Sequence, residues 1–143
     1  MRKSDPGKRI LDELSRLVRE LSRISGGPDD GPAMTATQRL ALFDLVDDGP
    51  LRLNDLAQRM GTSAPTASRA VDALLELGLV ERHPDPNDRR AITIELTDEG
   101  RRSVEERKAR VYAAFRPAAA ALSLADREQL ADLLARLAAE LSY

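Results

Sequence analysis

Two short stretches of the chain gather hydroxyl and guanidinium side chains. One lies around residues 63–69, and the other is the acidic and basic run at residues 88–90. Hydroxyl groups and arginines donate hydrogen bonds to phosphate oxygens and to base edges, and short side chains fit into a DNA groove. The chemistry indicated is therefore recognition rather than catalysis. The residues predicted at such a surface are Ser63, Pro65, Thr66, Ser68, Arg69, Asp88, Arg89 and Arg90.

The first stretch belongs to a predicted helix-turn-helix. Residues 54–60 have the pattern of a short helix that stops at Gly61, and the hydroxyls of Thr62 and Ser63 can then cap a second helix whose first turn tolerates Pro65. Apolar residues recur at steps of three and four along the second helix, so they should pack inward. The inward set is Ala67, Ala70, Val71, Leu74 and Leu77, and the outward set is Thr66, Ser68, Arg69 and Asp72. In such motifs the start of the second helix enters the major groove.

The second stretch forms the tip of a predicted β-hairpin. Gly78 ends the second helix, and residues 79–83 and 91–96 have the apolar patterns of strands around a tip at residues 83–90. A helix-turn-helix followed by a hairpin is a winged helix-turn-helix. The expected fold class is therefore mainly α with a small β wing.

Helices are also predicted on both sides of this winged-helix segment. We place a DNA-binding lobe at residues 34–97 of a single domain, 1–143, and a helical region at residues 8–25 and 98–143. A glycine-, proline- and aspartate-rich loop at residues 26–32 separates the first helix from the lobe. The first and last helices carry apolar stripes without partners in the lobe, which predicts a homodimer. The expected dimer contacts are Leu11, Leu14, Val18, Leu21, Leu130, Leu134, Leu137 and Leu141.

Helix ends are marked by side chains that cap free amides. Thr35 and Gln38 have the spacing of a capping box, and Thr97 and Ser123 are placed to cap two later helices. Pro117 cannot donate the backbone hydrogen bond of a helix, so the long helix after Thr97 should kink or end nearby.

Composition excludes most other chemistry. The chain has no cysteine, which excludes disulfides, thiolate catalysis, zinc fingers and thiol-based redox sensing, and its one histidine, His83, is too few for the usual catalytic zinc sites. The run at residues 85–88 is similar to the start of a calcium loop, but arginines stand where such a loop needs glycine, and no glutamate follows at its end. No glycine-rich phosphate loop occurs in the sequence. We expect no enzyme activity, metal or cofactor. No run is long enough to span a membrane, so we expect a cytoplasmic protein.

Bulk charge does not by itself favour DNA. The net charge is −2, and residues 51–97 hold six basic against seven acidic side chains. The positions of the arginines therefore matter more than their number. Arg69 lies on the predicted second helix and Arg90 at the wing tip, where a groove-binding fold needs cations.

The order and spacing of these pieces resemble the MarR family of bacterial transcriptional regulators. The resemblance extends from Thr35 to Gly100 and rests on the segments 53–57, 68–72, 78–82, 85–90 and 96–100. It implies a homodimer that binds a palindromic double-stranded DNA operator, with the second helix in the major groove and the wing in the minor groove. In the Asp-x-Arg pattern of the family, Arg90 would enter the minor groove and Asp88 would hold it in position.

The resemblance also implies that the DNA binding of this protein is regulated and that the protein most simply acts as a repressor. Many relatives bind small phenolic or other lipophilic molecules that lower operator affinity, so a small lipophilic or aromatic ligand is expected. Phe43, Tyr112 and Phe115 are candidates to line its cleft, although aromatic residues on helices more often belong to the core. The alternative function is a winged helix that binds proteins and not DNA. A protein-binding module needs no cationic tip, so Arg89 and Arg90 favour DNA binding. Salt-sensitive retention on heparin would distinguish DNA binding from protein binding.

Overall fold

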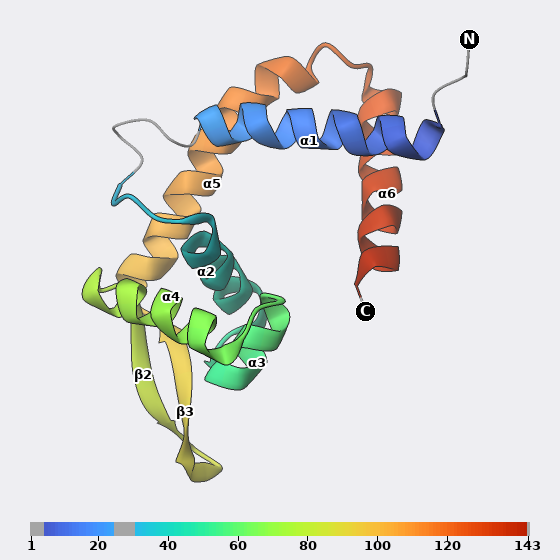
Figure 1. The fold of residues 1–143 in the computed structure, drawn as a ribbon. Coiled ribbons are helices and arrows are strands. Elements are labelled where there is room, and N and C mark those ends of the chain that lie inside the picture. The colour runs from blue at the N-terminus through green and yellow to red at the C-terminus, as the bar shows by residue number, and fades with distance from the viewer. Residues whose placement is uncertain (1–4, 25–30, 143) are drawn as a thin grey trace. The chain divides into compact units, whose positions relative to one another are not determined.

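The computed structural model describes residues 5–24 and 31–142. Most of the loop expected at residues 26–32, and the expected helix ends Ser25 and Tyr143, lie outside the described residues. Six helices and three strands occur in the described part of the chain (Figure 1). They are α1 (Pro6–Ile24), α2 (Ala36–Asp48), β1 (Leu51–Arg52), α3 (Leu53–Arg59), α4 (Ala64–Glu76), β2 (Val80–Asp85), β3 (Asp88–Leu96), α5 (Asp98–Ala119) and α6 (Leu124–Leu141).

These elements form two compact units. The winged-helix lobe comprises the described residues from 31 to 108, and the helical unit comprises α1, the part of α5 from Ala109 onward, and α6. Helix α5 therefore contributes its first part to the lobe and its second part to the helical unit. The mainly helical fold with a small antiparallel sheet agrees with the expected fold class.

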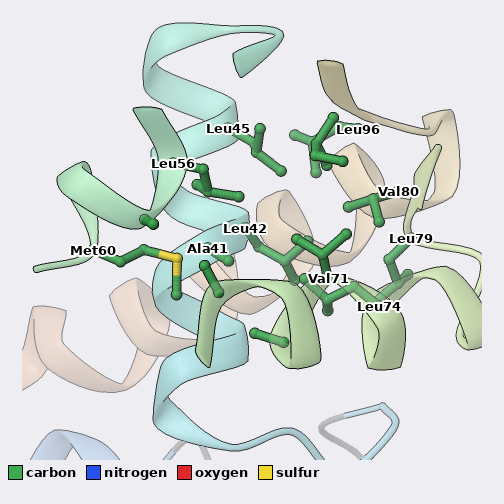
Figure 2. Close-up of a cluster of buried hydrophobic side chains, with 14 of the residues drawn as sticks. Ala41, Leu42, Leu45, Leu56, Met60, Val71, Leu74, Leu79, Val80 and Leu96 are labelled. Atoms are coloured by element: carbon green, nitrogen blue, oxygen red, sulfur yellow. The ribbon is translucent and has the colours of Figure 1, made fainter. Parts of the chain in front are cut away.

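The lobe has one aliphatic core. Side chains from α2, α3, α4 and the sheet point toward one another in it (Figure 2). The buried set is Ala41, Leu42, Leu45, Leu56, Ala57, Met60, Ala67, Ala70, Val71, Leu74, Leu79, Val80, Ile94, Leu96 and Val104. Each large member contributes about 1.5–3 kcal/mol by leaving water. This core fixes α4 against α2 and α3, so the opposite face of α4 is turned outward.

The inward face predicted for α4 is confirmed with one exception. Ala67, Ala70, Val71 and Leu74 are buried, but Leu77 is 37% exposed. The prediction for Leu77 is wrong because the helix ends at Glu76 and Leu77 is its C-cap residue.

The predicted caps are confirmed. Thr35 and Gln38 form the capping box of α2, the Ser63 hydroxyl accepts from the Thr66 amide at 3.3 Å, and Pro65 lies in the first turn of α4. At α6, the Ser123 hydroxyl accepts from the Asp126 amide at 3.1 Å. Pro117 lies near the end of α5, which stops two residues later at Ala119.

The sheet is larger than predicted. Its strand order is β1-β3-β2, and both pairings are antiparallel. The wing strands run on to Asp85 and begin again at Asp88, so the turn at the tip contains only residues 86–87. Strand β1 was not predicted, because two residues are too few to show an alternating pattern. The register of β2 with β3 is regular from Val80 to Pro84 and then shifts before Asp85.

A close contact seats the start of α5 on the end of α4. The Thr97 hydroxyl donates to the Gly78 carbonyl at 2.7 Å and accepts from the Gly100 amide at 3.0 Å. A Cβ at Gly100 would lie 2.0 Å from the carbonyl oxygen of Leu79, so only glycine fits there. One turn later, Val104 enters the lobe core.

Gly100→Ala should destabilise the protein strongly. The added methyl group would force backbone apart at this contact, and overpacking of this kind costs about 1–3 kcal/mol or more. Thermal and urea unfolding measure the loss. Gly7→Ala is the matched control, because a Cβ at Gly7 meets nothing closer than 3.6 Å and alanine favours helices. Equal melting temperatures for the two variants would contradict the steric argument.

Candidate nucleic-acid interface

The N-terminal part of α4 presents a short polar face. Ser63, Pro65, Thr66 and Arg69 are exposed and Ser68 is half-buried. The Ser63 hydroxyl donates to the Thr66 hydroxyl at 2.9 Å, so its proton is already used within the protein. The structure thus places all five predicted α4 residues at or beside one helix start, with the Thr66 hydroxyl and the Arg69 guanidinium as its outward donors.

The wing tip presents the second group of predicted residues. Asp88, Arg89 and Arg90 are all exposed, and the wing strands extend away from the helices of the lobe (Figure 1). The Asp88 carboxylate accepts from the Arg90 backbone amide at 3.0 Å. It therefore orders the backbone at Arg90, and in residues 5–24 and 31–142 no side chain pairs with the Arg90 guanidinium. That guanidinium is available to a phosphate or a base edge.

Asp85 is a residue of this region that the sequence analysis missed. Its Oδ2 accepts from Arg52 Nε at 2.6 Å, and its Oδ1 accepts from the Asn87 amide at 2.8 Å. The residue is only 8% exposed, although the Arg52 side chain is 44% exposed. The hydrogen bond from Arg52 and that from the Asn87 amide hold the pKa of Asp85 below its usual value. The two partners are 33 residues apart, so no local pattern marks the pair.

A further ion pair joins α4 to the wing. Arg82 of β2 contacts the carboxylate of Asp72 on α4, and both side chains are exposed. On the wing, His83 lies 3.1 Å from the Glu81 carboxylate and 3.8 Å from that of Glu95. Its imidazole is exposed. Within the described ranges no group of three potential ligand side chains could hold a metal ion.

Two carboxyl groups of the lobe should have pKa values shifted in opposite directions from the ordinary value of 3.8. Burial, followed by the nearby Asp48 charge, raises the pKa of Asp44, whereas Arg52 lowers the pKa of Asp85. Ionised Asp85 therefore stabilises the fold above its unfolded pKa, and this contribution is lost as the pH falls through its lower folded pKa. Ionised Asp44 destabilises the fold near neutral pH, and the penalty disappears as the pH falls below 3.8.

Carbon-detected NMR titration of the carboxyl groups measures both values. Arg52→Ala should raise the pKa of Asp85 and leave that of Asp44 in place. An Asp85 that titrates at 3.8 or above in the parent protein would contradict the importance of the ion pair.

Comparison with known proteins identifies the family. Residues 34–92 match the MarR family, and these residues contain both the α4 face and the wing tip. A probable transcriptional regulator of Pseudomonas aeruginosa has a crystal structure that is 33% identical, with a TM-score of 0.68 over 90% of this chain and 96% of that one. The chain belongs to the MarR family. This MarR-family chain has the winged helix-turn-helix of a DNA-binding transcriptional regulator, as the sequence predicted.

Two further relatives of this MarR-family protein are similar over most of their length. An uncharacterized helix-turn-helix transcriptional regulator of Mycobacterium bovis is 28% identical over 96 residues, which are 67% of each chain. The BpsR protein of Bordetella bronchiseptica is 26% identical, with a TM-score of 0.67 over 91% of this chain and 98% of that one. The structure of BpsR concerns the regulation of its DNA binding by 6-hydroxynicotinic acid.

The helical unit of this MarR-family chain leaves its apolar side chains uncovered. Neither α1 nor α6 has a buried residue. Leu14 and Leu21 are half-buried, and the other six predicted dimer residues are exposed. The two helices border a cleft of about 380 Å³ lined mainly by Ile10, Leu133 and Leu137. In the part of the chain that the structure describes, no helix is both long and apolar enough to cross a bilayer.

The three aromatic candidates do not share one environment. Phe43 packs against the lobe core, with the Lys108 ammonium 5.6 Å from its ring centre. The cavity that Phe43 helps to line holds only about 10 Å³, which is about the volume one water requires. Tyr112 is 65% exposed and Phe115 is 36% exposed, so the interpretation of these two as core residues is wrong.

Proposed function

We propose that this MarR-family regulator is a cytoplasmic repressor that binds a palindromic operator as a homodimer. The observation that carries the proposal is the exposed polar start of α4 in the same lobe as an exposed arginine at the wing tip. Helix α4 would place Thr66, Ser68 and Arg69 in the major groove, where hydroxyls and guanidinium groups reach base edges and phosphates. The wing would place Arg90 in the adjacent minor groove.

A homodimer supplies the second half of the recognition surface. The uncovered stripes of α1 and α6 support it, because a leucine face in water is an unfavourable state that a second copy removes. The residues proposed at the interface are Leu11, Leu14, Val18, Leu21, Leu130, Leu134, Leu137 and Leu141. Two-fold symmetry then requires two inverted half-sites whose centres lie about ten base pairs apart.

We also propose that a small aromatic or lipophilic acid releases the repressor. The support is the relative BpsR, whose DNA binding is regulated by 6-hydroxynicotinic acid. A ligand of this kind acts through its different affinities for the free and DNA-bound states, typically about 1–3 kcal/mol. The chain has no cysteine, so release by thiol oxidation is not part of the proposal.

Selection of binding sites from random duplex DNA tests the proposed function. The purified protein should enrich an inverted repeat with about ten base pairs between half-site centres, and binding to it should fall steeply with salt. Addition of aromatic acids, 6-hydroxynicotinic acid among them, should weaken the complex. No enriched sequence and no salt-sensitive retention on heparin would favour the protein-interaction module instead.

A further inference from the structure

The tip of the wing is not oriented by the regular β-ladder. Strands β2 and β3 pair residue by residue from Val80 with Leu96 to Pro84 with Ile92, and then the register shifts so that Asp85 pairs with Asp88. Residues 89–91 of β3 therefore have no partner in the register of β2. Arg90 belongs to this segment, so its direction depends on contacts other than the ladder.

Asp85 provides those contacts at the point where the register breaks. One carboxylate oxygen binds the Asn87 amide and thereby shapes the two-residue turn, and the other binds Arg52. The backbone of Arg52 is held in place, because Arg52 of β1 pairs with Thr93 of β3 and directly precedes α3. The tip is thus connected through one charged hydrogen bond to the rigid base of the helix-turn-helix.

We propose that Arg52 and Asp85 are positioning residues that aim Arg90 of the wing tip into the minor groove. The proposal rests on the proposed function and refines it, because it assigns the orientation of the finger to a pair outside the Asp-x-Arg motif. Asp88 orders only the Arg90 backbone amide. Asp85 and Arg52 set the direction of the whole turn.

The direction in which one substitution changes DNA affinity distinguishes this positioning role from a direct contact between Arg52 and a phosphate. Asp85→Asn removes a negative charge from a surface that meets DNA and leaves Arg52 in place. If Arg52 acted on phosphate, this change would strengthen binding or leave it unaltered. Positioning predicts the opposite, a weakening of roughly five- to thirtyfold, within the range for one specific arginine contact.

The experiment measures operator affinity for the parent, Asp85→Asn, Arg52→Ala and Arg52→Lys by fluorescence anisotropy at one salt concentration. Arg52→Ala should bind as weakly as Asp85→Asn, and Arg52→Lys should recover part of the loss because it keeps a cation near Asp85. Asp48→Asn is the matched control: it breaks the Arg59–Asp48 pair of 2.9 Å in the same lobe, away from the wing. It should bind like the parent. Melting temperatures identify any variant that fails to fold.

A double substitution tests whether the pair acts through Arg90. Asp85→Asn should cost nothing further in an Arg90→Ala background, whereas a general loss of stability would lower affinity in both backgrounds. A parent that binds no operator would overturn the proposed function and this inference together. A parent that binds and loses affinity in Arg90→Ala, with Asp85→Asn as tight as the parent or fully additive with Arg90→Ala, would overturn this inference alone. If Asp85→Asn does not fold, Arg52→Ala in the two backgrounds gives the same test.

Discussion

Leu134→Glu should dissociate the proposed homodimer and abolish operator binding. Leu134 lies in the α6 stripe and is 37% exposed in the single chain, so a second copy would cover it. An unpaired carboxylate at a dry interface costs several kcal/mol, and a symmetric dimer would contain it twice. One lobe alone offers half of the contacts, so we expect operator affinity to fall by more than about 100-fold.

Sedimentation velocity and anisotropy with operator DNA measure the two effects in the same sample. Ala135→Glu is the matched control, because the next residue along α6 is turned by about 100° from Leu134 and lies off the stripe. It introduces the same charge and should leave the dimer intact. A Leu134→Glu protein that remains dimeric at micromolar concentration would show that α6 does not form the interface.

Arg90→Ala should weaken operator binding by about 1–3 kcal/mol, which is roughly five- to 150-fold, and should leave the melting temperature nearly unchanged. The structural reason is that the Arg90 side chain is exposed and, within the described residues, pairs with no other side chain. Its removal therefore costs the folded protein little. Its proposed partner is the DNA.

Arg89→Ala provides the comparison for Arg90→Ala. The two arginines are adjacent, equally charged and exposed, so bulk electrostatics would give them the same effect. A minor-groove finger predicts a larger and more sequence-dependent loss for Arg90. Asp88→Ala should show a smaller loss of the same kind, since it orders only the Arg90 backbone. Equal losses for the two arginines would contradict the assignment of Arg90.

The parts of the fold that depend on local rules were predictable from sequence. Capping residues such as Thr35, Ser63 and Ser123 act within three residues of their position, and the buried face of α4 follows from helical periodicity. Strand β1 was missed because its two residues form a strand only by pairing with β3. Leu77 was misplaced because a helix end is a less certain feature than a helix.

The same distinction between local features and long-range contacts applies to the candidate site. The hydroxyls and arginines of α4 and the wing tip could be found from residue type and spacing, since each group is local. The pairing of Arg52 with Asp85 and that of Arg82 with Asp72 depend on how separate elements come together. In the sequence, Asp85 belongs to the hairpin tip, the calcium-like run and the family segment 85–90, and none of these assigns its side chain a role. Nothing near it in sequence indicates that it is buried or that an arginine from β1 reaches it.

The contact between the start of α5 and the segment that follows α4 determines where the chain can be cut into fragments. A fragment that stops at Thr97 keeps the hairpin but loses the Gly100 contact and the Val104 side chain that completes the core. A fragment that continues to Lys108 keeps both, and it coincides with the compact lobe. Lobes exchanged between relatives should therefore be joined within α5 after Lys108. A chimera joined at the end of the wing would carry the proposed DNA-binding surface of one parent on a start of α5 shaped for another.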